Sequence, residues 1–148
     1  EVEGLEKIKF ITSNPFDFAI DLVDALKLPK IDRYLHLPVQ SGDNGILKKM
    51  NRRHTREDYL ELVSEIRRAV PEIELGTDII VGFPGETEEQ FQNTVDLVRT
   101  VKFNVIFASM YSARPGTASA KLYKDDVPLT VKRYRHAYLT KVWKESKS

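Results

Sequence analysis

Short runs of apolar and β-branched residues occur at four places in the chain, and polar or turn-forming residues bound each of them. Such runs predict strands, here at residues 7–12, 34–39, 75–83 and 105–111. Between them, apolar residues recur every three to four positions, the spacing of a helix that buries one face. The predicted helices lie at residues 19–26, 46–50, 59–70, 91–101 and 131–147. Strands and helices therefore alternate along the chain.

Two of these helices carry further local signals. Thr87 followed by Gln90 fits a capping box, in which each side chain satisfies a free backbone N–H at the helix start. The last helix has an apolar stripe, with lysine or arginine at many other positions, which predicts an amphipathic helix. The stripe consists of Val131, Tyr134, Tyr138 and Val142.

This alternation predicts an α/β fold. Crossovers of this length join parallel strands, so helices should pack outside a parallel sheet in right-handed βα units, as in a barrel or in a doubly wound sheet. The nearly continuous apolar character of the strands indicates burial on both faces. Four βα units are half of a typical barrel, so we expect a partial barrel or a piece of a larger protein.

The composition is typical of an ordinary soluble domain. The 148 residues are 41% hydrophobic and 30% charged, enough for one core and unlike disordered or fibrous chains. No apolar run approaches the roughly 20 residues of a membrane-spanning helix, and a signal-peptide pattern is absent, so a cytoplasmic location is expected. Without cysteine the chain has no disulfide or thiolate ligand, and its three scattered histidines do not favour a zinc site.

Charge is unevenly distributed, although the formal net charge is only +1. Residues 48–56 contain five lysines and arginines and no acid, and residues 121–148 contain eight against three acids. One such run is typical of a solvated helix face. Two runs in one small domain favour a polyanionic partner.

Polar residues and glycines follow each predicted strand, where ligands of parallel α/β proteins bind. They are residues 12–15, 40–42, Asp78 with 82–87, and 112–117. The Gly82–Gly85 loop precedes a helix, as a phosphate cradle does, but Glu86, Glu88 and Glu89 would repel a phosphate there. The loop fits a structural turn equally well, and it lacks P-loop and dinucleotide fingerprints.

Asp78 interrupts an apolar strand, where an unpaired carboxylate would be costly, so we expect it to have a structural partner or a ligand. Arg52 and the adjacent Arg53 are either solvent-exposed residues at the end of a helix or residues whose guanidinium binds a carboxylate. These groups, with the amide and hydroxyls of Gln40 and Ser41, suit a ligand that has an ammonium, a carboxylate and ribose hydroxyls. The histidines are expected to be one core residue, His36, and two surface residues, His54 and His136.

Four motifs, taken in order, resemble those of the radical S-adenosylmethionine (SAM) methylthiotransferases. They are HLPVQSG at residues 36–42, MNR at 50–52, TDIIVGFPGET at 77–87 and YSARPGT at 111–117. With a turn at residues 13–15, the resemblance covers nearly the whole chain. It implies a partial TIM-like barrel in which SAM binds a 4Fe-4S cluster and is cleaved to a 5′-deoxyadenosyl radical. That radical takes hydrogen from the substrate, and a methylthio group is installed.

The same resemblance implies that residues 1–148 are the later half of a radical SAM core domain. In that family the cluster ligands lie in a CxxxCxxC loop after the first barrel strand, and this chain has no cysteine. The family's N-terminal methylthiotransferase domain and C-terminal RNA-binding domain are also missing. We therefore expect a fragment that supplies barrel and SAM-binding residues, is inactive alone, and needs the other half of its own barrel.

Carried over by position, the resemblance assigns several residues to SAM. Gln40 and Ser41 would face its ribose or methionine part. Arg52 would bind its carboxylate, and Asp78 its ribose or amino group.

The loop residues Gly82, Pro84 and Gly85 would shape the strand end beside the adenine. The motif at residues 111–117 resembles the branch that thiomethylates a modified adenosine beside the tRNA anticodon more than the branch that acts on a ribosomal protein. Arg114 is the discriminating position and would bind the substrate. The basic C-terminal residues agree with the anticodon stem-loop of tRNA as the partner.

Two other functions stay open. The same residues would serve a radical SAM enzyme with a different substrate, or the chain would be a basic α/β module that binds RNA without catalysis and ignores SAM. A lyase or aldolase barrel is disfavoured because no lysine lies at a strand end in a position to form a Schiff base.

Overall fold

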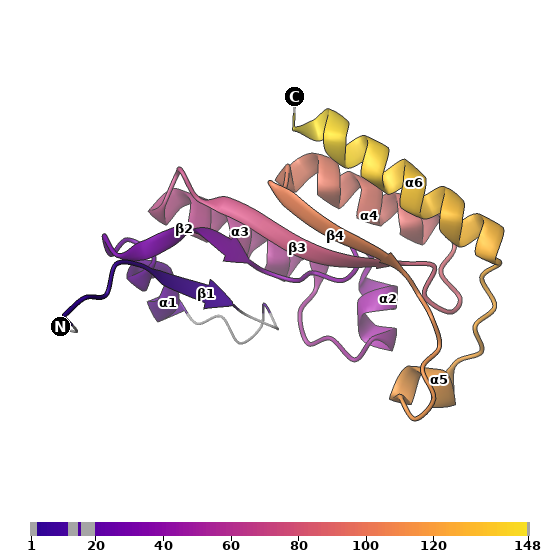
Figure 1. Ribbon diagram of the computed structural model, residues 1–148. Coiled ribbons are helices and arrows are strands. Elements are labelled where there is room, and N and C mark those ends of the chain that lie inside the picture. Colours follow the sequence, from indigo (N-terminus) through magenta and orange to yellow (C-terminus); the bar gives the residue numbers. More distant parts are fainter. Residues whose placement is uncertain (1–2, 12–14, 16–19, 148) are drawn as a thin grey trace.

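One parallel sheet organises the computed structural model of the protein, which describes residues 3–11, 15 and 20–147 (Figure 1). Its strands, in spatial order, are β1 (Ile8–Ile11), β2 (Ile31–His36), β3 (Glu74–Val81) and β4 (Val105–Met110). The helices are α1 (Ile20–Ala25), α2 (Asn44–Lys49), α3 (Arg56–Ala69), α4 (Glu88–Val101), α5 (Ala118–Leu122) and α6 (Leu129–Ser146). Thr12 and Ala19, which border the first predicted strand and helix, and the turn residues Ser13 and Asn14, lie outside the described residues.

The strand order distinguishes between the two α/β architectures left open by the sequence. All three strand pairings are parallel, and spatial order equals chain order. The long helices α3, α4 and α6 pack on the same face of the sheet (Figure 1). A doubly wound sheet reverses its strand order and has helices on both faces. The partial, TIM-like barrel is therefore confirmed.

The core lies between the sheet and these helices. In β3, Leu75, Ile79 and Val81 are fully buried against an apolar layer that includes Phe91 and Val95 of α4. Successive side chains of a strand point to opposite faces, so Asp78 and the residues in register with it lie on the other face. That face is only partly covered in the part of the chain that is described, since Phe107, the partner of Asp78 in β4, is 60% exposed. The prediction of burial on both faces is thus wrong for this chain.

Strand β2 begins three residues earlier than predicted. The sequence pattern hides its start because Asp32 is polar, yet Asp32 is buried and its carboxylate pairs with Lys7 at 3.0 Å and Lys9 at 3.7 Å. β2 also ends at His36, before the predicted end at residue 39. Beyond it, the N–H of Val39 donates to the side-chain hydroxyl of Thr77 at 2.9 Å and not to a backbone carbonyl of β3.

Helix α6 buries only part of the predicted stripe: Val142 is buried and Tyr138 packs against the core. Tyr134 is exposed, and the inward-facing residues of α6 are Lys132, Arg135, Leu139 and Val142. The two inward-facing cations each have a carboxylate partner: Arg135 pairs with the buried Glu86, and Lys132 pairs with the partly exposed Asp125. In contrast, the capping box at Thr87 is confirmed, α5 was not predicted, and no described helix is both long and apolar enough to cross a bilayer.

Candidate functional site

A cavity of about 490 Å³ lies at the carboxyl ends of β3 and β4. One wall comes from the end of α2 and the turn after it, residues 48–52. Ile80 and Phe83 supply the wall at the end of β3. The side beyond β4 is formed by Tyr111 with residues 117–119, 122 and 123. The cavity therefore lies where ligands of parallel α/β proteins bind.

The turn after α2 brings Arg52 to this cavity. Asn51 adopts a left-handed conformation at φ 57°, which ends the helix, and the N–H of Arg52 then bonds to the Leu47 carbonyl at 2.9 Å. The Nε atom of Arg52 is buried and has no hydrogen-bond partner among the described residues. A buried cationic donor without a partner is costly. A carboxylate in the cavity would satisfy it.

Aromatic rings form the opposite wall. The ring of Phe83 contacts Tyr111 edge-on, with centroids 5.1 Å apart, and Tyr123 at 6.0 Å. Lys49 extends over the Tyr123 ring. An apolar, aromatic surface with nearby cations suits a planar heterocycle better than a bare phosphate. Phe83 and Tyr111 were not predicted as site residues from the sequence, although Phe83 lies within the predicted Gly82–Gly85 loop.

The glycine loop is held by a buried ion pair. Gly82 and Gly85 have φ of 72° and 76°, which other residues rarely adopt. The carboxylate of Glu86 accepts the N–H of Gly82 at 2.9 Å and the Nη1 of Arg135 at 3.0 Å. Burial raises the pKa of Glu86, although the Gly82 N–H and Arg135 act in the opposite direction.

This pairing corrects the prediction that Glu86 belongs with the acids at the helix start. Glu86 precedes the N-cap Thr87 and faces Arg135, so only Glu88 and Glu89 lie in the first turn of α4. Pro84 is buried in the same loop.

Lys132, a second cation of α6, contacts both the loop after β3 and the segment after β4. The side chain of Lys132 packs against Gly82, where an added Cβ would lie 2.4 Å from its Cγ. Its Nζ donates to the Tyr111 carbonyl at 3.0 Å and to Asp125 at 2.6 Å. Helix α6 therefore fixes both loops that border the cavity.

The turn after β2 places Gln40 next to β3. Gln40 is buried with φ 72°, its N–H bonds to the Asp78 carbonyl at 2.9 Å, and its own carbonyl accepts from Ile80 at 2.9 Å. The hydroxyl of Ser41 is buried and lies 3.3 Å from that of Thr94 in α4. Ser41 thus anchors the turn to α4, and its hydroxyl is directed to that helix.

Asp78 has the partner that the sequence predicted, but it is not buried. Its carboxylate lies 3.2 Å from the Nε2 of His36, and the Asp78 side chain is 40% exposed. His36 is half-buried in this pair and is not a core residue. The prediction for His54 is wrong, because it is buried and its Nε2 lies 3.2 Å from the Val39 carbonyl. His136 is partly buried, with its Nε2 3.0 Å from the Ala108 carbonyl.

The structure brings most predicted site residues to the same end of the sheet. Gln40 is hydrogen-bonded through its backbone between Asp78 and Ile80. Ile80 is two residues after Asp78 in β3, so the two side chains lie on the same face of the sheet. Ile80 and Arg52 both line the cavity. Of the predicted site residues, Arg52 alone lines this cavity. The lining does not include Gln40, Ser41, Asp78, Gly82, Pro84 or Gly85, nor Arg114, which is exposed on the loop after β4.

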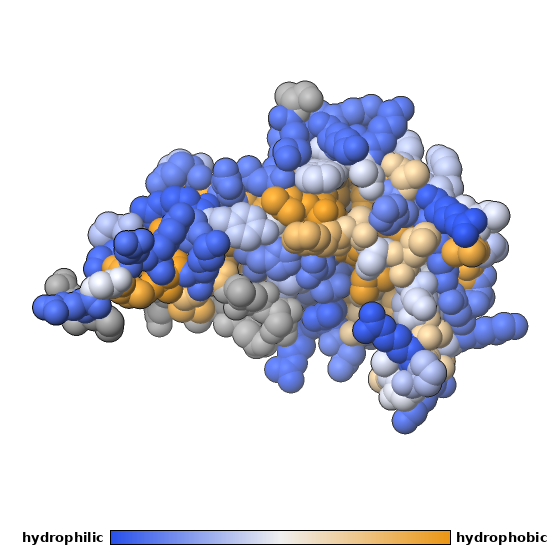
Figure 2. Space-filling model, in the orientation of Figure 1, coloured by the Kyte–Doolittle hydropathy of each residue, from blue (hydrophilic) through white to orange (hydrophobic). Residues whose placement is uncertain are grey.

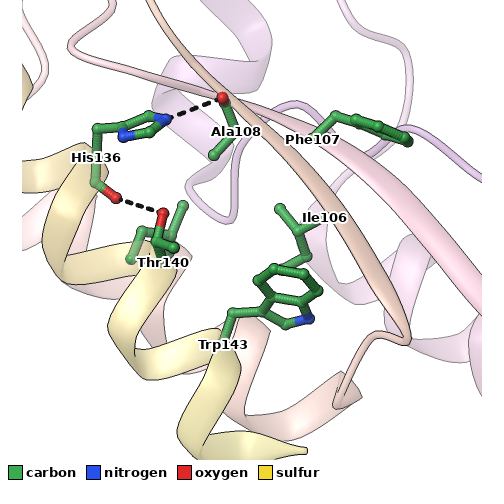
Figure 3. A pocket seen from close by; sticks show the side chains of 7 residues that line it. Ile106, Phe107, Ala108, His136, Thr140 and Trp143 are labelled. Atoms are coloured by element: carbon green, nitrogen blue, oxygen red, sulfur yellow. Dashed lines mark hydrogen bonds between the residues drawn. The ribbon is translucent and has the colours of Figure 1, made fainter.

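A second hollow, of about 290 Å³, lies at the outer edge of the sheet between β4 and α6 (Figure 3). Its lining is mainly apolar, with Ile106, Leu139 and Trp143, and His136 turns its imidazole to the Ala108 carbonyl. Figure 2 shows the apolar surface along this edge. The hollow has no cluster of charged groups.

Comparison with known proteins identifies the family of the chain. The sequence pattern of the Radical SAM superfamily matches residues 3–98. The chain belongs to the radical SAM superfamily.

The chain is also similar to two relatives in sequence and to one solved structure in fold. A tRNA-2-methylthio-N(6)-dimethylallyladenosine synthase from Thermosipho melanesiensis is 47% identical over 146 residues, which are 98% of this chain and 34% of that protein. One of the same name from Clostridium botulinum is 48% identical over 145 residues, 97% of this chain and 32% of that protein. The chain therefore spans about a third of their length. Coproporphyrinogen III oxidase (HemN) from Escherichia coli, a radical SAM enzyme, has the same fold, with a TM-score of 0.73, 22% identity and 92% of this chain covered.

Membership of the radical SAM superfamily implies SAM and an iron–sulfur cluster, and the residues of this chain fit the first. The unpartnered Nε of Arg52 matches a carboxylate, and the wall of Phe83 and Tyr111 matches a purine. They do not fit the cluster, because the chain has no cysteine and no group of acids and histidines that could hold a metal occurs among the described residues.

Proposed function

We propose that this chain is the later half of the radical SAM core of a methylthiotransferase that acts in the cytoplasm on a modified adenosine beside the tRNA anticodon. The observation that carries the proposal is the 47% identity, over 98% of this chain, to a protein named for that reaction. The chain contributes the SAM-binding end of the barrel, and the 4Fe-4S cluster is held by residues outside it.

The roles proposed for individual residues start from Arg52, which lines the cavity. Gln40 adjoins the cavity-lining Ile80, which lies two residues after Asp78, and Gly82, Pro84 and Gly85 flank the cavity-lining Phe83. Arg52 binds the carboxylate of SAM through its guanidinium, whose Nε atom is buried and has no hydrogen-bond partner among the described residues. Asp78 binds the amino group or a ribose hydroxyl, with Gln40 beside it on the ribose or methionine part. Ser41 supports this part through its bond to α4. The loop of Gly82, Pro84 and Gly85 holds Phe83 beside the adenine.

In this arrangement SAM supplies the one-electron chemistry of the family, and the chain's own residues orient it. The anionic end of the cofactor is held at Arg52, and the aromatic wall excludes water from its planar end. The tRNA substrate approaches the open end of the sheet, where Arg114 is exposed. Lysines 48 and 49 lie on the same rim and can contact phosphate.

The role of Arg52 is tested in the full-length enzyme by titration with SAM. Arg52→Gln should weaken SAM binding roughly tenfold or more, because a charge-assisted hydrogen bond is worth about 1.5–3 kcal/mol. Arg53→Gln is the matched control, since it removes the same charge one residue away. Equal SAM affinity in the two variants would refute the assignment.

The activity is tested on tRNA nucleosides by mass spectrometry. Deleting the gene in its host should remove the methylthio group from the adenosine beside the anticodon, and the full-length gene should restore it. An unchanged nucleoside profile would refute the substrate. Loss of a methylthio group from a ribosomal protein instead would place the enzyme in the other branch of the family.

A further inference from the structure

A hydrogen-bonded line of three side chains lies on the open face of the sheet. The hydroxyl of Tyr34 is 3.1 Å from the Nδ1 of His36, and the Nε2 of His36 is 3.2 Å from the Oδ2 of Asp78. Tyr34 and His36 come from β2 and Asp78 from β3. The line therefore crosses from one strand to the next and ends at the proposed cofactor residue.

Gly76 makes this arrangement possible. It is paired with His36 in the sheet, and a Cβ at this position would lie 1.9 Å from the Tyr34 hydroxyl and 2.9 Å from the His36 Nδ1. Glycine within a strand weakens it and often marks a close approach of another group. Here the approaching groups are the Tyr34 hydroxyl and the His36 imidazole, which occupy the space that a side chain at position 76 would fill.

The geometry also fixes which nitrogen of His36 carries the proton. Burial and the negative charge of Asp78 raise the pKa of Tyr34, so its hydroxyl stays protonated and can donate to Nδ1. An ionised carboxylate can only accept, so the proton of a neutral imidazole is on Nε2, which donates to Asp78, and Nδ1 accepts from Tyr34. The ring of Phe107 packs against the imidazole with centroids 5.7 Å apart and limits its rotation.

One oxygen of Asp78 is thereby held in place while the carboxylate stays accessible. His36 engages Oδ2, and the Asp78 side chain is 40% exposed, so it can still accept a hydrogen bond from a ligand. We propose that His36 and Tyr34 are positioning residues for the cofactor site: His36 orients the Asp78 carboxylate, and Tyr34 selects the tautomer of His36 that does so. The proposal rests on the proposed function, in which Asp78 binds SAM.

The test uses two substitutions of His36 in the full-length enzyme. Glutamine places an amide N–H close to the position of Nε2 and keeps the bond to Asp78, whereas asparagine is one carbon shorter and cannot reach it. His36→Asn should raise the Kd for SAM roughly tenfold, equivalent to about 1.4 kcal/mol, and His36→Gln should stay within about twofold of the parent. Equal loss in both variants, at unchanged melting temperature, would overturn the proposal.

A double-mutant cycle with Asp78→Asn separates this proposal from the proposed function. If His36 acts through Asp78, His36→Asn should cause no further loss of SAM affinity in the Asp78→Asn background. If Asp78→Asn weakens binding and the two effects simply add, only the positioning role fails. If Asp78→Asn leaves the Kd unchanged, the proposed role of Asp78 fails as well.

The tautomer gives a readout that needs no unstable variant. Nitrogen NMR of the parent enzyme should show His36 protonated at Nε2, and Tyr34→Phe should move part of the population to the other tautomer and raise the Kd for SAM about threefold or more, since roughly 0.7 kcal/mol is lost. A parent enzyme protonated at Nδ1 would overturn the proposal.

Discussion

Arg135 is the cation on which the loop after β3 depends, and replacing it with methionine tests that dependence. The side chains of Arg135 and Glu86 are 6% and 1% exposed, and their nearest atoms are 3.0 Å apart. Arg135 also donates to the Glu86 carbonyl at 3.0 Å. Methionine fills much of the same space but provides neither bond.

The expected loss is large because the partner stays behind. Removing one member of a buried ion pair leaves an uncompensated charge and costs about 3–5 kcal/mol. At roughly 2–4 °C per kcal/mol for a unit of this size, the melting temperature should fall by roughly 6–20 °C. The surrounding loop should loosen as well, since Glu86 also holds Gly82.

The loss should depend on pH in a defined direction. Burial already raises the pKa of Glu86, and removal of Arg135 raises it further because the neutral form is then preferred more strongly. A carboxyl whose pKa is raised in the folded state gives stability below its ordinary pKa that is lost as pH rises through the folded pKa. The Arg135→Met variant should therefore recover stability relative to the parent as the pH is lowered from about 8 toward 5.

Thermal denaturation of the full-length enzyme followed by circular dichroism measures both effects. Arg133→Met on the same helix is the control, because Arg133 is exposed and its loss should change stability by less than about 0.5 kcal/mol. The double variant Glu86→Gln/Arg135→Met should recover part of the stability, since glutamine keeps an acceptor for the Gly82 N–H. If Arg135→Met and Arg133→Met have the same melting temperature at every pH, the buried pair does not stabilise the loop.

Three further predictions concern the glycine loop, a buried histidine and the open edge of the sheet. Gly82→Ala should destabilise the full-length enzyme and weaken SAM binding, because it adds a 2.4 Å contact to an unfavourable φ of 72°, whereas Gly116→Ala, at φ 87° with no atom within 4 Å of the added Cβ, should cost only about 1–2 kcal/mol. Equal melting temperatures of these two variants would contradict the packing against Lys132. Burial lowers the pKa of His54 from its ordinary 6.5, so its contribution to stability is present above pH 6.5 and is lost as the pH falls through the lowered value. Melting curves from pH 7.5 to 5 should show this slope in the parent and a flatter one in His54→Gln. The isolated chain should self-associate in light scattering, because β4 is an edge strand with Phe107 60% exposed; a monomer with a sharp cooperative melt would contradict this.

The sequence alone determined the elements whose signals are local. Apolar spacing located the long helices, and the side chains of Thr87 and Gln90 predicted a helix start that the structure shows. The four strands were found within a few residues, and their separation by helices required parallel pairing. The sequence also predicted Gln40, Arg52 and Asp78 as cofactor residues, and the structure places Arg52 at the cavity.

Only the tertiary structure decided what depends on partners distant in the chain. Local periodicity could not show that Arg135 faces inwards, because its partner Glu86 is 49 residues away. The same holds for the burial of Asp32, which pairs with Lys7 just before β1 and with Lys9 in β1. It also holds for the line from Tyr34 to Asp78, which needs a glycine at position 76. Hydrophobic pattern reports which positions avoid water, whereas a buried polar group is stable only beside its complement, and that complement is set by how the strands and helices pack.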